Sequence, residues 1–182
     1  MPKATVPGGP LVALQDCWIK IPVGNSMEYT VDLYSLPDIS DSKSASYNDE
    51  PIIGRAFPLK TYSHSDNRTI SMQLHFFVTH PDDVTKNLDH LRALESAVYP
   101  RVDDISGAPF VPPPVCRIKC GELLAREHLC VVLKQYSVKF PIDVAWDENT
   151  YIPWKFDVDT TWEVVYKSPD LPGQRRILFT GK

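Results

Sequence analysis

Alternating apolar and polar side chains between residues 69 and 79 predict a strand with one buried face. In TISMQLHFFVT, one face carries Ile70, Met72, Leu74, Phe76 and Val78, and the other carries Ser71, Gln73, His75 and Thr79. Only Phe77 departs from the alternation. The pattern is typical of an antiparallel strand that packs one face on a core and turns the other to solvent.

The hydrophobic period changes to that of a helix directly after this strand. In HPDDVTKNLDHLRALESAVYP, one helical stripe carries Val84, Leu88, Leu91 and Val98, with Leu94 at its margin. Pro81 and the neighbouring Asp82 and Asp83 suit a first helical turn, where backbone amides are unpaired and the helix dipole is positive. Pro100 ends the predicted helix.

Three more strands are predicted after the helix. Val115 to Lys119 alternate before Gly121. In residues 130–142, the predicted face carries Cys130, Val132, Tyr136, Val138, Phe140 and Ile142, with Lys134 as the exception. In the segment VDTTWEVVY, the predicted inward face carries Val158, Thr160, Trp162, Val164 and Tyr166. Two strand-like pieces near 28–34 and 52–59 precede all of these.

One helix and about six strands predict an α+β domain, mainly antiparallel β, with its sheets curled into a sandwich or a split barrel. The domain should span residues 17–167. Within it, residues 35–51 are polar and rich in Ser and Asp, so we expect a long exposed loop. Residues 1–16 and 168–182 are interpreted as N-terminal and C-terminal arms. A chain of 182 residues is long enough for one domain with a substantial core.

Composition adds limits on location and partners. No signal peptide or membrane span is predicted, so we expect the chain to stay in the cytoplasm where it is made, with its four cysteines reduced. A net charge of −4 and the absence of any block of Lys or Arg argue against direct nucleic-acid binding. Arg175 and Arg176 form only a pair.

The cysteines and histidines do not predict a metal site. Cys116 and Cys120 should point to one face of a strand about 13 Å apart, too far to share a zinc ion, and are interpreted as small core residues. His75 should face away from the core. The other histidines, His64, His80, His90 and His128, lack a metal-binding spacing and are expected at the surface or at caps. No cofactor is expected.

Enzyme motifs are also missing: the sequence has no GxSxG, GxxxxGK[ST] or GxGxxG. The acidic pairs Asp82/Asp83, Asp103/Asp104 and Asp147/Glu148 lie at a helix start or in loops, where carboxylates cap or are solvated. Trp162 is assigned to the core, and Trp18, Trp146 and Trp154 to loop anchors or a protein interface. We therefore predict no catalytic residue and no enzyme.

The order of segments carries a family resemblance. PIIGRAFPL, TISMQLHFF, DDVTKNLDHLRALESAVYP, PPPVCRIKCGE, YSVKF and TTWEVVY follow one another as in the tail-tube-like domain of LysM-containing baseplate proteins of contractile phage tails and injection systems. The resemblance covers about residues 50–167. It implies a tail-tube-like fold of two packed sheets with one helix alongside. Pro112, Pro113 and Pro114 would then stiffen the entry into the strand at Val115; the other interpretations are a docking motif and a CxxxC metal site.

The resemblance implies a structural virion protein, a homohexameric ring that joins the tail tube to the baseplate hub and spike proteins. The charge and the lack of a long apolar run argue against nucleic-acid and membrane contact. Only about fifteen residues follow Tyr166, too few for a LysM module, so peptidoglycan binding is not implied. Two alternatives stay open. One is a small cell-wall glycan-binding or hydrolytic module that uses the tryptophans with Asp147 and Glu148, and the other is a baseplate wedge component.

Overall fold

The computed structural model describes residues 12–24, 27–100, 111–125 and 127–166. In chain order, the elements within these ranges are β1 (Cys17–Gly24), β2 (Met27–Asp32), β3 (Asp38–Ser42), β4 (Ala45–Glu50), β5 (Leu59–Ser65), β6 (Thr69–Phe77), α1 (Pro81–Ser96), β7 (Cys116–Cys120), α2 (Gly121–Leu124), β8 (Leu129–Lys139) and β9 (Lys155–Val164).

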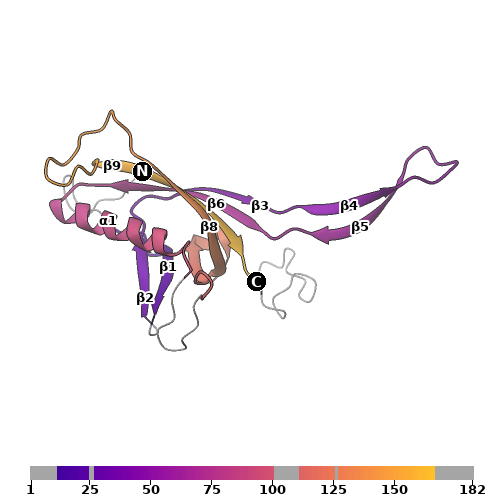
Figure 1. The fold of residues 1–182 in the computed structure, drawn as a ribbon, viewed down its shortest axis with the longest axis horizontal. Coiled ribbons are helices and arrows are strands. Elements are labelled where there is room, and N and C mark those ends of the chain that lie inside the picture. The colour runs from indigo at the N-terminus through magenta and orange to yellow at the C-terminus, as the bar shows by residue number, and fades with distance from the viewer. Residues whose placement is uncertain (1–11, 25–26, 101–110, 126, 167–182) are drawn as a thin grey trace.

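Seven of the strands form one curved antiparallel sheet in the order β2-β1-β7-β8-β9-β6-β3. The predicted α+β class with mainly antiparallel strands is confirmed. The sheet does not close into a barrel, and α1 lies alongside it (Figure 1). The other two strands, β4 and β5, pair with each other as a separate ribbon. Within the described ranges, the core therefore lies between one concave sheet face and the helix, rather than between two large sheets.

The core is built where the alternation is clearest. On β6, Ile70, Met72, Leu74 and Phe76 are buried as predicted. The inward face of the adjacent β9 carries Phe156, Val158, Thr160, Trp162 and Val164. Trp162 is fully buried and donates its indole hydrogen to Thr160 Oγ1 at 2.8 Å, and Thr160 donates in turn to the carbonyl of Met72 at 3.0 Å. The one polar atom of this large core side chain is thus satisfied.

The residues that were predicted to face inward from β8 were assigned correctly only in part. Val131 and Leu133 are buried, whereas Val132 is only half-buried. The register to β9 shifts between Leu133 and Gln135, which is a β-bulge at Lys134. A bulge adds one residue to one strand and so reverses the facing of the positions that follow. Tyr136 and Val138 consequently do pack against the core. Phe140 and Ile142 were also assigned to the inward face, and both are exposed beyond the end of β8.

The helix begins at Pro81 as predicted. His80 is its N-cap, its ring accepts from the Asp82 amide, and the Asp83 carboxylate accepts from the His80 amide at 2.9 Å. The buried stripe is rotated from the predicted one. It carries Asp83, Val84, Asn87, His90 and Leu94, so Leu94 lies at its centre and Leu88 is only half-buried. The prediction that His90 is a surface residue was therefore wrong.

The expectation of a long loop over residues 35–51 was also wrong. This segment contains β3, which pairs with β6, and β4, which pairs with β5. Its side chains are mostly exposed on both faces, so pairing of the backbone rather than burial of alternate side chains holds these strands. Conversely, residues 52–58, predicted as part of a strand, form the turn between β4 and β5.

The boundary of the N-terminal arm also needs correction. Residues 12–16 belong to the domain, because Leu14 packs against the core and its amide donates to the Leu33 carbonyl at 2.8 Å. Residues 1–11 and 167–182 lie outside the described ranges, as do Asp103, Asp104, Arg175 and Arg176. The run from Pro112 to Pro114 has no regular secondary structure and leads directly into β7, which agrees with a stiff entry into that strand.

Candidate assembly surface

A two-stranded arm projects from one end of the sheet. β4 and β5 continue the direction of β3 and β6, and they extend along the longest axis of the molecule beyond the rest of the described fold (Figure 1). Backbone pairing runs from Ala45 opposite Ser65 to Glu50 opposite Leu59, with a bulge beside Ser46. The arm turns at its tip through Gly54, whose φ of 88° is a conformation that favours glycine.

The arm carries large apolar side chains in solvent. Ile53 is 104% exposed and Phe57 is 82% exposed, both in the turn at the tip. Along the ribbon, Tyr47 and Tyr62 lie directly opposite each other, with ring centroids 5.8 Å apart in an edge-to-face arrangement. Ile52 and Leu59 are also partly exposed. Since Ile53 and Phe57 at the tip lie almost entirely in solvent, this arm is the strongest candidate for a surface that another protein covers.

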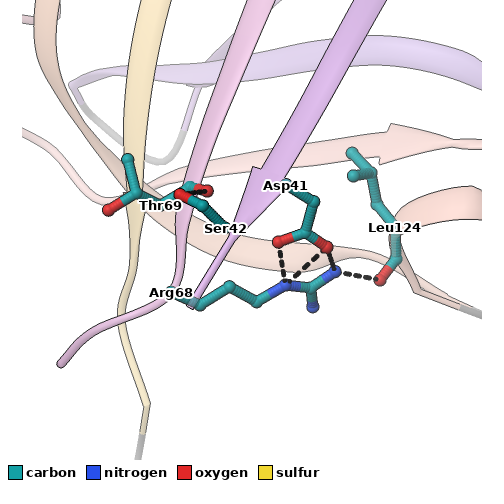
Figure 2. A network of polar contacts seen from close by, with 5 residues as sticks. All are labelled: Asp41, Ser42, Arg68, Thr69 and Leu124. Atoms are coloured by element: carbon teal, nitrogen blue, oxygen red, sulfur yellow. Dashed lines mark hydrogen bonds and ion pairs between the residues drawn. The ribbon is translucent and has the colours of Figure 1, made fainter. Parts of the chain in front are cut away.

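Polar contacts fix the root of the arm. Figure 2 shows Arg68, which precedes β6, with its guanidinium against the carboxylate of Asp41 on β3. Arg68 Nε donates to the two carboxylate oxygens at 2.9 and 3.0 Å, and Nη2 donates to Oδ2 and to the Leu124 carbonyl. Ser42 donates to the Thr69 carbonyl at 3.3 Å, also seen in Figure 2. These contacts hold β3 and the start of β6, from which the arm extends, to each other and to α2.

The electrostatics agree with a defined ion pair. Hydrogen bonds from Arg68 lower the pKa of Asp41 below its ordinary value, and the same bonds raise the pKa of Arg68. A planar guanidinium that meets a carboxylate in this way fixes an orientation as well as a distance. Closer to the arm, between β3 and β4, the Ser44 hydroxyl donates to the Asp66 carboxylate at 2.5 Å, and the Asp66 amide donates to the Ser44 carbonyl at 3.0 Å.

A second exposed apolar group lies at the opposite end of the long axis. The connection between β8 and β9 is there (Figure 1), and it carries Ile142 at 92% exposure together with Phe140, Trp146, Tyr151 and Trp154. The Asp147 carboxylate is used within this connection, because it accepts from the Thr150 amide at 2.8 Å and the Thr150 hydroxyl at 2.5 Å. Asp147 is therefore a turn-capping residue in this structure.

The outer sheet face is polar and bears cross-strand ion pairs, among them Lys134 with Glu163 at 2.6 Å, Lys139 with Asp159 at 2.5 Å and Arg117 with Glu28. His75 lies on this face as predicted, and its ring contacts Asp157 at 2.7 Å. The sheet ends at β2 on one side and at β3 on the other, so each of these strands pairs on one side only within the described sheet. Such edges can add a strand from another chain.

A buried polar cluster lies between α1 and the sheet. His90 is only 5% exposed, and its Nδ1 lies 2.9 Å from the Tyr29 hydroxyl. Asn87 is fully buried and donates to the Phe77 carbonyl at 2.9 Å. His90 Nε2 and Asn87 Oδ1 have no hydrogen-bond partner within the described chain. Burial lowers the pKa of His90, because the imidazolium would lose its hydration.

The remaining candidates are dispersed. Cys116 and Cys120 are both buried on the inner face of β7, as expected for small core residues, and Cys116 donates weakly to the Pro114 carbonyl at 3.6 Å. Among the described residues, no group of three or more His, Cys, Asp or Glu side chains is arranged to hold a metal ion. No helix within the described ranges is long and apolar enough to cross a membrane. The exposed arm escaped the sequence interpretation, although Ile53 and Phe57 in a polar surrounding were its signal.

Comparison with known proteins finds similarity among solved structures only. No protein-family model and no curated protein matches the chain. Among solved structures, the chain is similar to a chain of the anti-feeding prophage baseplate, determined by cryo-electron microscopy with sixfold symmetrisation. The alignment covers 91% of this chain and 95% of that chain, at 9% identity and a TM-score of 0.38. With so low a TM-score, the assignment of the fold rests on the strand order and register described above.

Proposed function

We propose that this chain is a structural virion protein, a ring-forming adaptor that joins the tail tube to the baseplate hub of a contractile phage tail. The sequence resemblance of residues 50–167 suggests the class of particle. The observation that carries the proposal is the projecting arm with Ile53 and Phe57 in solvent. Apolar side chains on a protruding ribbon lose contact with water only when another chain covers them.

The placement of the two apolar groups favours a ring. The arm tip and the β8–β9 connection lie at opposite ends of the molecule (Figure 1), so they cannot meet within one chain. A contact between the arm of one copy and a different surface of the next is heterologous, and it forms a closed ring when the rotation closes. We propose a homohexamer on the tail axis, without catalytic chemistry, built in the host bacterial cytoplasm and located in the virion.

The proposed function can be tested by replacing the apolar side chains at the arm tip with charged ones and measuring ring formation. Ile53→Asp with Phe57→Asp should leave a folded monomer that no longer forms rings, because the tip makes no core contact. Asn48→Asp is the matched control, since it adds a charge on the same arm at an exposed polar position. Mass photometry and negative-stain microscopy of the three proteins would measure the fraction in rings.

Two results would contradict the proposal. Wild-type protein that stays monomeric at high concentration, both alone and with tail-tube protein, would argue against an adaptor. Cryo-electron microscopy of the intact particle that finds this chain off the tail axis, among the wedges, would assign it to the baseplate periphery. Binding of a cell-wall glycan by a monomer, lost in Trp146→Ala and Trp154→Ala, would instead favour the glycan-binding alternative.

A further inference from the structure

Two cysteines from distant parts of the sequence lie directly opposite each other in the sheet. Cys17 begins β1, Cys120 ends β7, and the two are register partners in the antiparallel pair. Their sulfur atoms are 2.7 Å apart although 103 positions separate them in the sequence. Cys17 is 3% exposed and Cys120 is 0% exposed, so both thiols lie within the core.

The backbone between them has the arrangement that a cross-strand link requires. The Gly121 amide donates to the Asp16 carbonyl at 2.7 Å, and this bond flanks the Cys17 and Cys120 pair. Flanking bonds of this kind mark a non-hydrogen-bonded pair, in which α-carbons are about 4.5 Å apart and side chains approach most closely. That spacing falls within the roughly 4.4–6.8 Å of natural disulfides. The sulfurs need to approach by only about 0.7 Å to bond.

We propose that Cys17 and Cys120 are a site of oxidative modification, and that they form a reversible cross-strand disulfide when the folded protein meets a peroxide. One cysteine of the pair, as its thiolate, attacks one peroxide oxygen, the O–O bond breaks, and that cysteine becomes a sulfenic acid while the released hydroxide takes up a proton to give the first water. The sulfur of the other cysteine, after losing its proton, attacks the sulfenic sulfur and forms the S–S bond, and the displaced hydroxide takes up a proton to give the second water. In total, two thiols lose two protons and two electrons, and one hydrogen peroxide is reduced to two waters.

The two thiols are coupled by the contact between their sulfur atoms. The hydrogen bond between the two thiols lowers the pKa of Cys120 and, together with burial, raises the pKa of Cys17. A cavity of about 390 Å³ beside the start of β1 is lined by Leu14, Cys17, Leu36 and Gly121, among others, so a small oxidant can approach the pair from the side of Cys17.

The expected consequence is thermal stabilisation. The link would join the first strand of the sheet to a strand from the second half of the chain and close a loop of about one hundred residues in the unfolded state. Restricting the unfolded chain to that extent corresponds to a rise in melting temperature of roughly 10 °C for a domain of this size. The rise should be reversed by dithiothreitol.

Mass spectrometry of the full chain tests the link. Protein is treated with hydrogen peroxide, denatured with an alkylating reagent, and digested. We expect a peptide pair joining Cys17 to Cys120, two hydrogen atoms lighter than the separate peptides, together with the rise in melting temperature. A variant with Cys116→Ala and Cys130→Ala keeps the proposed pair and should behave like wild type, whereas Cys17→Ala should yield neither the linked peptide nor the temperature shift.

Three outcomes would overturn the proposal. The first is alkylation of both Cys17 and Cys120 after a treatment that oxidises an exposed thiol added as an internal standard. The second is linkage of either sulfur to Cys116 or Cys130. The third is the expected linked peptide without any rise in melting temperature, since the link would then have formed in a non-native chain. The wild-type and Cys116/Cys130 measurements decide the question even if Cys17→Ala does not fold.

Discussion

Leu74 and Ser71 lie on the same strand and face opposite sides of the sheet. Leu74 is fully buried and Ser71 is exposed. Leu74→Asp should lower the free energy of unfolding by about 4 kcal/mol, because an unpaired carboxylate would enter the core. Ser71→Asp should cost less than about 1 kcal/mol. Urea denaturation followed by circular dichroism compares the two variants.

Ser71 is a better control than Gln73, which lies two positions further along the same outer face of β6. Gln73 lies opposite Asp38 on one side and Asp159 on the other, so an aspartate there would add repulsion between like charges. If Leu74→Asp and Ser71→Asp were equally tolerated, the register of β6 would be wrong.

His90 should make stability depend on pH. Its pKa in the folded state is below the ordinary value because of burial; Asp32 and Asp89 oppose that shift, and Lys86 adds to it. Above pH about 6.5 the imidazole is neutral in both states and contributes no slope. As pH falls below that value, the unfolded chain takes up a proton that the folded chain does not. The free energy of unfolding should therefore decrease until the lowered pKa of the folded state is reached.

Denaturation curves at several pH values between about 7.5 and 5 measure this slope. His90→Gln should flatten it, since glutamine keeps a polar group near Tyr29 without titrating. A slope of equal size in wild type and His90→Gln would assign the effect to the other histidines or to the carboxylates.

At the scale of elements, Arg68 should hold the arm to the sheet. Arg68→Ala removes the contacts to Asp41 and the Leu124 carbonyl, so it should lower the free energy of unfolding by about 1 kcal/mol, a modest value because the pair is partly solvated. Amide exchange in β3 should become faster. Hydrogen exchange with mass spectrometry checks this. Lys60→Ala breaks an ion pair further out on the arm, with Asp49, and should have almost no effect.

The elements that could be predicted are those with one buried and one solvated face. β6 and β9 show the apolar period of strands, and their inward faces were assigned correctly; α1 was found with its correct start, although its buried stripe is rotated from the predicted one. β3, β4 and β5 were not found because their side chains are exposed on both faces, which leaves no alternation to detect. β1 did carry a signal in Cys17, Ile19 and Ile21, but it is short and interrupted at Pro22.

The candidate site was predictable only in part, for a related reason. Sequence alternation assigns residues to a face but does not show which strands leave the core, so the arm and the contact between Arg68 and Asp41 could not be inferred. The bulge at Lys134 and the buried positions of Asn87 and His90 each break the period that the interpretation relied on. The meeting of Cys17 and Cys120 depends on the order of strands in the sheet, which local pattern does not encode.

For the whole molecule, the terminal segments offer a test independent of the arm. Residues 12–16 contact the domain, so a truncation should stop at residue 11. We expect variants lacking residues 1–11 or residues 168–182 to keep the melting temperature within a few degrees and to fail to join the particle. Particles assembled with the truncated protein in place of wild type would show its presence or absence by mass spectrometry. Incorporation at the wild-type level would contradict a role of these segments in assembly.

The direction of the arm has a mechanical consequence. Between the core and the tip, the chain runs outward through β3 and β4 and returns through β5 and β6, with the strands nearly parallel to the long axis (Figure 1). In an antiparallel pair the hydrogen bonds are perpendicular to the strands. A pull on the tip along this axis moves the outgoing and returning strands together, so the shear falls on the hydrogen bonds between β6 and β9, many at once, instead of opening them one after another. The β6–β9 pairing, which runs from Thr69 opposite Glu163 to Phe77 opposite Lys155, distributes the same load into the centre of the sheet.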